Sequence, residues 1–521
     1  MRLILPLLLA VPLLAQPDLV PEPAWRAIFG AVSARQIMED TEALSRRHRY
    51  PNSRGFLDAA AWVQERAAEA GLINPRLERF DERAPFWDPV EATLDLLAPE
   101  TLRLADLRDV PVLLMERSAD GEIEGELVDA GEGSRAEDFA NLDVAGKILL
   151  TRRSPGRLWP DLAKRGALGV LSAASPRFFG RAVPAEATAW QQAPRGAVAF
   201  SISPKLGTEL AALRRQGPVR VKMRARSGQS APGATALLLT EMPGGAPGRD
   251  VVVVAHLDHQ QPGANDNASG SAAILEAARV WRQLIGTGAL PEPRRRVRFW
   301  WSTEISSEGK YFQRYPDESR NILLAVNLDQ AGGERGADNH LIAILSPDWL
   351  PSWADDLIHQ IAGSAGRLAP PEHAPSPLTL APEGSQQPLR PVFWPYAPLS
   401  DHVPFVDKTV RVPAISLAVP SLSVIHTDFD SPARLDPTWL KRSAAVTLAA
   451  AAWAANAGPE EANALLRYST SQAASRIAAA ADRQAQLKQE ERRLDSFRAL
   501  DPALDIEPHR RRLRAVARAL D

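Results

Sequence analysis

One run of residues, 251–258, constrains the fold of this chain more than any other segment. Four consecutive valines at 251–254, flanked by turn-forming residues, predict a fully buried strand. Because side chains alternate along a strand, His256 and Asp258 at its end are expected to point the same way. The carboxylate can then orient or polarise the imidazole. Taken alone, such a pair is typical of a hydrogen-bonded strand end.

A loop rich in Gly and Asn follows the strand, and it contains a further carboxylate, Asp266. From about Ser269 the apolar residues recur at helical spacing, which predicts a helix directly after the loop. Ligands of open α/β sheets bind in the loops at the carboxyl edge of the strands. This loop is therefore a candidate binding segment.

Further strands are predicted along the chain, at 296–303, 322–329, 341–345 and 413–419. Residues 391–398 are rich in Pro and aromatic side chains and are expected to form a loop. Repeated alternation of apolar strands and helices predicts an α/β fold with a doubly wound, at least partly parallel sheet flanked by helices.

The length of 521 residues predicts two or three domains. Residues 17–84 have mostly helical patterns and, with 229–458, are expected to form one discontinuous α/β domain that contains the central strand. Residues 85–228 have short β-like runs with Pro and Gly at the edges, which predicts a small β-rich insertion, read as a lid or spacer. Residues 459–521 predict a helical extension, either a packing arm or a contact between copies of the chain.

Composition and the first residues limit the class of protein. The net charge of −2 gives no global basic footprint for nucleic acid. Residues 1–15 match a secretory signal peptide, too short for a permanent membrane anchor, so an exported, periplasmic or extracellular, soluble product is expected. The chain has no cysteine, so any metal must be held by His, Asp and Glu.

Carboxylates and imidazoles recur at the ends of the predicted strands or in the loops just after them. A hydrolytic zinc site needs three protein ligands and an open position for water, and two ions can share one carboxylate. The candidate residues are His256, Asp258, Asp266, Glu304, Asp329, His402 and His426.

The order of these motifs resembles the co-catalytic zinc aminopeptidases of metallopeptidase family 28, a group that also contains glutamate carboxypeptidases. Residues 125–129 and 143–147 of the insertion are similar to the protease-associated domain found in many members. Each motif is weak alone, but six in the same order are a specific signal. The six are Ala255–Asp258, Gly263–Gly270, Arg298–Glu304, Asn327–Asp329, Ser400–Phe405 and Ile425–Thr427.

The resemblance implies a role for each candidate. His256 and Asp329 would hold one zinc ion, His426 the other, and Asp266 would bridge the two. Asp258 would support His256 from behind, Glu304 would be the general base, and His402 would line the pocket or support a ligand. The remaining histidines, including His48, His259, His340, His359 and His509, are interpreted as structural or surface residues.

One departure from the family pattern concerns the residue after Glu304. The family has two adjacent glutamates there, a base and then a zinc ligand, whereas this chain has Glu304 followed by Ile305. The chain is therefore expected to bind one or two zinc ions, with the His426 ion in doubt. Glu308 is a possible substitute from the next turn. If the alignment shifts by one residue, Glu304 becomes the ligand and Thr303 occupies the base position.

The resemblance implies a secreted zinc exopeptidase, first of all an aminopeptidase acting on the N-terminal residues of peptides. Two alternatives remain open. A non-catalytic binding scaffold of the same fold, as in the transferrin receptor, is favoured by Ile305. A carboxypeptidase or a glutaminyl-cyclase-like enzyme would use the same fold with a different substrate end.

Overall fold

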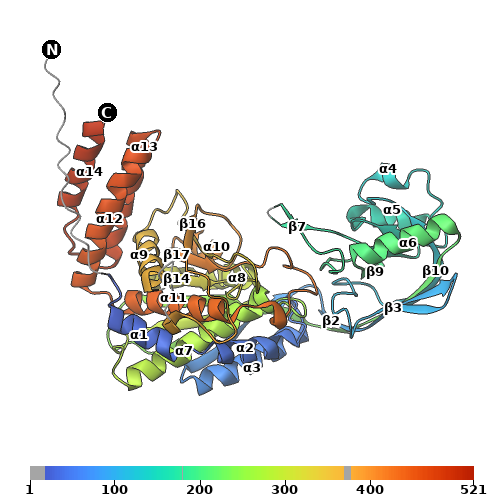
Figure 1. The fold of residues 1–521 in the computed structure, drawn as a ribbon, viewed down its shortest axis with the longest axis horizontal. Helices are drawn as coiled ribbons and strands as arrows, with labels where there is room; N and C mark the ends of the chain where they lie inside the picture. The colour runs from blue at the N-terminus through green and yellow to red at the C-terminus, as the bar shows by residue number, and fades with distance from the viewer. Residues whose placement is uncertain (1–17, 179, 369–376, 521) are drawn as a thin grey trace, which may run out of the picture.

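The computed structural model describes residues 18–520 except 179 and 369–376. The predicted signal peptide, residues 1–15, lies outside this range. Figure 1 shows a central α/β body, with a smaller sheet at one end and upright helices at the other. Within the described range, no helix has both the length and the apolar character needed to cross a membrane.

The described part of the central body contains an eight-stranded mixed sheet. β12 runs parallel to both of its neighbours, β13 and β14, whereas β1, β11 and β15 introduce antiparallel pairs. The predicted mixed, helix-flanked α/β sheet is confirmed. Its strands, in spatial order, are β1 (Ile73–Glu82), β11 (Gly233–Met242), β13 (Val297–Ser302), β12 (Asp250–His256), β14 (Ile322–Leu328), β17 (Ala414–Ala418), β15 (Leu341–Ile344) and β16 (Pro391–Trp394).

The valines of β12 are buried on both faces of this sheet. Val251 and Val253 belong to a core that includes side chains of α1, α2, α3, α7, α9 and α11. Val252 and Val254 belong to a second core formed with α8 and α10. The helices are α1 (Glu22–Ala31), α2 (Ala34–Ser45), α3 (Arg54–Glu69), α7 (Gly270–Gly286), α8 (Ser306–Arg314), α9 (Trp353–Leu368), α10 (His402–Val406) and α11 (Pro437–Asn456).

Two edge strands differ from the sequence-based expectation. β1 lies in a region predicted to be mostly helical, and β16 lies within the predicted loop 391–398. β1 is largely exposed and polar, so it lacks the apolar alternation that identifies a strand. β16 begins at a proline, which an edge strand tolerates because one side of its backbone needs no partner.

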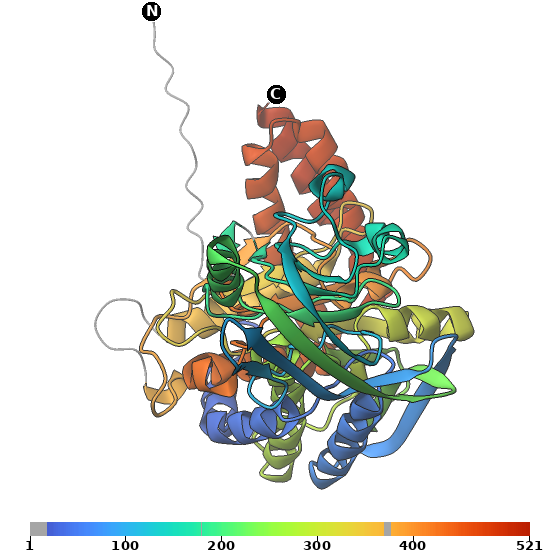
Figure 2. The ribbon, with the colours of Figure 1, turned by 90° about the vertical axis from the view of Figure 1, so that its right-hand side faces the viewer.

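A second sheet is formed by residues between 86 and 230. Figure 2 shows the molecule with this second sheet toward the viewer. A short hairpin, β7 (Arg177–Phe178) and β8 (Arg181–Ala182), extends from it toward the central body (Figure 1). The helices are α4 (Ala136–Phe139), α5 (Trp159–Lys164) and α6 (Pro204–Gln216), and the strands in spatial order are β3 (Leu102–Asp106), β2 (Phe86–Ala98), β10 (Arg220–Ser230), β4 (Gly121–Asp129), β5 (Lys147–Thr151), β6 (Gly169–Ser172) and β9 (Val198–Ser201).

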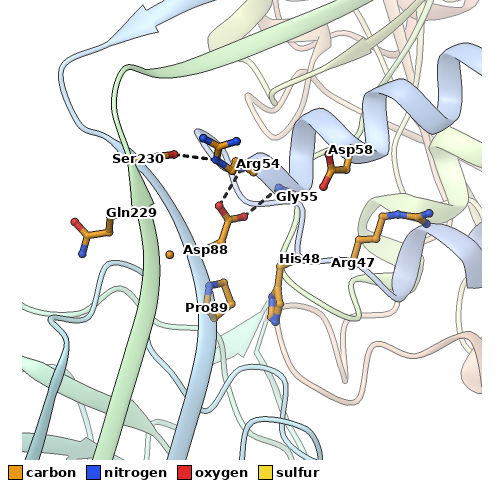
Figure 3. Close-up of a pocket in the computed structure, with 10 residues that line it drawn as sticks. Arg47, His48, Arg54, Gly55, Asp58, Asp88, Pro89, Gln229 and Ser230 are labelled. Carbon is orange, nitrogen blue, oxygen red and sulfur yellow. Dashed lines mark hydrogen bonds between the residues drawn. The ribbon is translucent and has the colours of Figure 1, made fainter.

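The two sheets are joined at the start of α3, beside a cavity of about 460 Å³ (Figure 3). Asp88 of β2 accepts hydrogen bonds from the backbone N–H groups of Arg54 (3.1 Å) and Gly55 (3.0 Å). The Arg54 Nε–H donates to Ser230 Oγ of β10 at 2.9 Å. Both connecting strands are thereby tied to the same helix of the central body. His48, which also lines the cavity, is partly buried, and its loss of contact with solvent lowers its pKa to about 3.

The C-terminal helices α12 (Pro459–Ala479) and α13 (Arg483–Ser496) pack against α9, and α14 (Glu507–Leu520) packs against α12 and α13. A buried ion network joins them to it. Arg476 of α12 contacts Asp356 of α9 and Glu490 of α13, both at 2.7 Å, and the two carboxylates are at most 2% exposed. Burial alone would raise the pKa of Asp356, but Arg476 and Arg493 hold it below its usual range.

Replacing Arg476 by alanine should destabilise the protein, because two buried carboxylates would lose their shared cation. Breaking a buried ion pair in this way costs about 3–5 kcal/mol. We expect the thermal unfolding midpoint to fall by several degrees. Lys164→Ala is the matched control, since it removes an exposed ion pair with Asp161 and should leave the midpoint unchanged. Equal unfolding midpoints for both variants would show that the buried ion network does not stabilise the packing of α12 and α13 against α9.

Candidate metal centre

Five of the predicted site residues meet at the carboxyl edge of the central strands. His256 is the last residue of β12, Glu304 lies two residues after β13, and Asp329 directly follows β14. Asp266 lies in the segment Ala264–Ser269 that leads into α7, with non-helical backbone angles, and His426 lies in the loop after β17. Residues up to 170 positions apart in the sequence are therefore neighbours because parallel strands end at the same edge.

Asp266 occupies the middle of this group, and its two carboxylate oxygens face different partners. Oδ1 lies 3.3 Å from Nε2 of His256. Oδ2 lies 3.0 Å from Nε2 of His426 and 3.5 Å from Nε2 of His259. Nε2 of His256 is also 3.3 Å from Oδ1 of Asp329. A carboxylate in this position can bridge two cations.

Among the described residues, two groups of three side chains have ligand atoms within 4.8 Å of one another. One group consists of His256, Glu304 and Asp329. The other consists of Asp266, His426 and His259, a histidine that the sequence analysis left as structural or surface. Nitrogen and carboxylate donors in groups of three suit zinc, which takes such ligands in hydrolytic sites.

The orientation of His256 leaves its Nε2 free for a cation. Its Nδ1 lies 3.0 Å from the backbone oxygen of Asp258, and a carbonyl can only accept a hydrogen bond, so Nδ1 carries the proton. Burial alone would lower the pKa of His256, but Glu304 and Asp329, with the bonded Asp258 and Asp266, raise it well above the usual value. The site therefore has an excess of negative charge that a metal cation would balance.

The Asp258 carboxylate contacts two parts of the site. Its Oδ1 lies 3.6 Å from Nδ1 of His256 and accepts a hydrogen bond from the backbone N–H of Glu304 at 2.7 Å. The residue thus supports His256 mainly through its backbone, and it fixes Glu304 through its side chain. It belongs to neither group of possible ligands.

Two asparagines hold the Asp266 turn against the neighbouring loops. Asn267 Oδ1 accepts hydrogen bonds from the backbone N–H groups of Gly270 and Gln330, both at 3.0 Å. Asn265 Nδ2 donates to the backbone oxygen of Val419 at 3.0 Å. A Cβ atom at Gly270 would lie 2.1 Å from Asn267 Oδ1, so only glycine fits there. These contacts explain the Gly/Asn-rich character of the loop.

Glu304 lies at a strained turn. The next residue, Ile305, has φ of +58°, which is unusual for a β-branched side chain, and its N–H donates to Asp401 Oδ1 at 2.8 Å. Strain of this kind costs about 1–3 kcal/mol and is concentrated at functional sites. Burial raises the pKa of Glu304 well above its usual range, with Asp329 and Asp401 adding to the effect of burial and His256 opposing it.

Three other residues from the sequence analysis lie outside both groups. Thr303 Oγ1 donates to the backbone oxygen of Ala236 at 3.1 Å. Glu308 is fully buried in α8, where its Oε2 accepts from Ser307 Oγ at 3.2 Å. Nε2 of His402 lies 2.9 Å from the backbone oxygen of Ala397, and burial lowers the His402 pKa to about 4. None of the three belongs to a described cluster of possible metal ligands.

A cavity of about 370 Å³ opens beside the two groups. Four site carboxylates, Asp258, Asp266, Glu304 and Asp329, line one part of it. The rest of the wall is mostly apolar and aromatic. These residues are Phe178, Trp190, Ile342, Ile344, Trp394, Leu399, Leu422 and Ile425.

Two of the wall residues come from the inserted segment. Phe178 of β7 and Trp190 both pack edge-on against His426, with ring centroids 5.2 and 5.5 Å away. The backbone N–H of Trp190 donates to the backbone oxygen of His426 at 2.8 Å. An antiparallel bridge between Ala189 and Thr427 extends this contact. The insertion therefore forms part of the wall of the site.

Comparison with known proteins gives one family match. A family model described as Peptidase family M28 matches residues 238–451. This range contains both groups of possible ligands.

Curated relatives are similar over part of their length. An aminopeptidase of Pseudomonas aeruginosa is 27% identical over 329 residues, which are 58% of this chain and 57% of that protein. Leucine aminopeptidase 2 of Trichophyton equinum is 25% identical over 338 residues, 63% of each chain. The chain therefore spans about three fifths of the curated relatives it matches.

Solved structures share the fold. A Peptidase M28 precursor from Shewanella amazonensis has a TM-score of 0.58 at 18% identity, covering 83% of this chain and 95% of that one. A zinc aminopeptidase from Bacillus subtilis has a TM-score of 0.56 at 18% identity, covering 80% and 94%.

Proposed function

The chain belongs to peptidase family M28 through residues 238–451, and from this premise we propose that it is an exported, zinc-dependent aminopeptidase. The observation that carries the proposal is the position of Asp266, whose two oxygens face two separate groups of imidazole and carboxylate donors. A non-catalytic scaffold has no need to keep two such groups together.

The donors fit zinc in number and type. His256 and Asp329 would hold one ion, His426 the other, and Asp266 would bridge them. Bound zinc would lower the pKa of a water molecule and polarise the scissile carbonyl. The protein contributes the buried carboxyl groups of Asp258, Asp266 and Asp329, whose positions are already fixed before substrate binds.

Glu304 is the proposed general base. It belongs to the His256 group, lines the cavity, and its backbone is fixed by Asp258. Its raised pKa suits a carboxyl group that takes a proton from the attacking water and later gives it to the leaving amine. Thr303, the alternative under a shifted alignment, has its hydroxyl directed to Ala236.

The charge of the cavity favours the amino end of a peptide. Among the described residues lining it there is no Lys or Arg, whereas four are Asp or Glu. The four acidic residues belong to the proposed metal centre, where bound ions would balance their charge, whereas a carboxypeptidase needs a further cation to hold the substrate carboxylate. The lack of a Lys or Arg among the described lining residues therefore argues against the carboxypeptidase alternative.

The apolar wall supports a preference for a large apolar N-terminal residue. Burying each extra CH₂ group of a substrate contributes about 0.8 kcal/mol. Leucine exceeds alanine by three carbons, so the sum is about 2.4 kcal/mol, about sixtyfold in kcat/KM. The inserted segment, which we propose is a protease-associated domain, would contribute to this choice through Phe178 and Trp190.

Leu399 provides a test of this apolar wall, because it lines the cavity yet is 45% exposed, so its replacement should not disturb folding. We expect Leu399→Asp to lower kcat/KM for a leucyl substrate by about tenfold, the equivalent of 1–2 kcal/mol of lost apolar contact. Leu102→Asp is the matched control, at a leucine of the second sheet that is 51% exposed, and should have no effect. Equal activity of the two variants would remove Leu399 from the substrate site.

The proposed activity is tested with a panel of three peptides carrying leucine at a free N-terminus, at an acetylated N-terminus, and at a free C-terminus. We expect hydrolysis of the first alone, lost on chelation and restored by zinc. Cleavage of the C-terminal peptide instead would favour the carboxypeptidase alternative. No cleavage with any added metal would favour the scaffold.

A further inference from the structure

Position 305 does not provide the carboxylate that the sequence comparison leads one to expect. Ile305 is 36% exposed, and its N–H is bonded to Asp401. Glu308, the substitute suggested by the sequence, is buried beside Ser307 and Asp401 and lies outside both groups. A cation held by Asp266 and His426 would therefore have no ligand from residue 305 or from Glu308.

His259 approaches the same cation position from another direction. Its Nδ1 lies 3.2 Å from the backbone oxygen of Gln260, so Nδ1 carries the proton and Nε2 has the lone pair. Nε2 is buried, makes no hydrogen bond, and lies 3.5 Å from Asp266 Oδ2. A buried nitrogen lone pair facing a carboxylate oxygen is unfavourable unless a proton or a metal ion lies between the two atoms, and a zinc site supplies the metal ion.

The backbone of His259 is held in this position by Arg49. The backbone N–H of Arg49 donates to the backbone oxygen of His259 at 2.7 Å, and the backbone N–H of His259 donates to the backbone oxygen of Arg49 at 2.9 Å. The buried Arg49 guanidinium donates to the backbone oxygens of Leu257 (2.8 Å) and Gly263 (3.0 Å), on either side of His259. The imidazole is thus preorganised, as a metal ligand requires.

The inserted segment closes the outer side of this group. The Trp190 ring lies 5.2 Å from His259 and 5.5 Å from His426, edge-on to both, and the two imidazoles are 5.4 Å apart. One indole therefore fixes the planes of both histidine rings. Its apolar body also limits the access of water to the space between them.

We propose that His259 is the third protein ligand of the ion held by Asp266 and His426, replacing the carboxylate that residue 305 lacks. This inference rests on the proposed function, because it presupposes a metal centre on Asp266. The ion then has two neutral imidazoles and one shared carboxylate, which is one negative charge fewer than a site with a glutamate would have. Nitrogen-rich sites select zinc over manganese or magnesium.

The test is the zinc content of the full-length protein after equilibration with micromolar zinc, measured by elemental analysis and by calorimetric titration. We expect two ions in the wild type and one in His259→Ala. His48→Ala is the matched control, since it removes the hydrogen bond from the Gln261 N–H in the same loop, at 3.3 Å, and a ring contact with Tyr50, but no member of either ligand group. That variant should keep two ions.

The outcomes separate this inference from the proposed function. Two ions in both wild type and His259→Ala, or one ion in both, would overturn the role of His259 and leave a zinc site intact. No zinc in the wild type would instead refute the proposed function. If His259→Ala does not fold, zinc-edge X-ray absorption of the wild type decides, because it should count three imidazoles over two ions rather than two.

Discussion

Replacing Asp266 by alanine is expected to remove both metal ions and all measurable peptidase activity. Its two oxygens face the two proposed ion positions, so a single substitution would leave only His256 and Asp329 as ligands at one position, and only His426 and His259 at the other. Removal of even a supporting partner of a ligand weakens metal binding by about 10–100-fold, and loss of a shared ligand should exceed this at both sites. Elemental analysis and hydrolysis of a leucyl substrate would measure the two effects.

A matched control separates the loss of a bridge from the loss of a negative charge. Asp338→Ala removes an aspartate whose side chain is 86% exposed, and it should retain full zinc content and activity. Asp266→Ala protein that still binds two ions would contradict the bridging role. Retention of one ion would mean that one group is complete without this carboxylate.

Replacing Glu304 by glutamine is expected to lower kcat by about 10²–10⁴-fold while zinc remains bound. The amide has nearly the same shape as the carboxyl group but cannot take a proton from water. Its backbone would still be fixed by Asp258, so the turn and the strained Ile305 should be unchanged. The measurement is kcat with a leucyl substrate, combined with zinc content on the same preparation.

The two readouts distinguish the possible roles of Glu304. Unchanged turnover would refute the general-base assignment. Loss of zinc together with turnover would identify Glu304 as a metal ligand, the role that the shifted alignment implies. Thr303→Ala then becomes informative, because a base at that position would make it inactive.

Much of the central fold follows from local patterns in the sequence. The valines of β12 are buried on alternate faces against different helices, which is what an uninterrupted apolar run predicts. The strand ends at His256, and the strands after it end near Glu304 and Asp329. Parallel strands bring such ends together, so the grouping of these residues could be predicted without knowing the register.

The position of His259 could not be predicted in this way. Alternation along an extended strand would place it opposite His256 and Asp258, but the strand ends at His256. The direction of its side chain depends on Arg49, more than 200 residues earlier, and on the Gly263 turn. The signal in the sequence was the position of His259 directly after Asp258 and three residues after His256.

The role of the insertion in the site was also hidden from the sequence. Phe178 and Trp190 lie in a segment with few carboxylates or histidines, which the sequence analysis interpreted as a lid or spacer. Their contact with His426 depends on how the second sheet docks, and no local pattern encodes that docking. The edge strands β1 and β16 were missed for a similar reason, because weak edge patterns become strands only beside their partners.

The most direct test of the metal centre is a crystal structure of the zinc-loaded protein with data collected at the zinc absorption edge. We expect two anomalous peaks about 3.5–4 Å apart, one on each side of Asp266. The first should contact His256 and Asp329, and the second His426 and His259, each at about 2.0–2.2 Å. A map with no zinc peak within bonding distance of Asp266 would contradict the account.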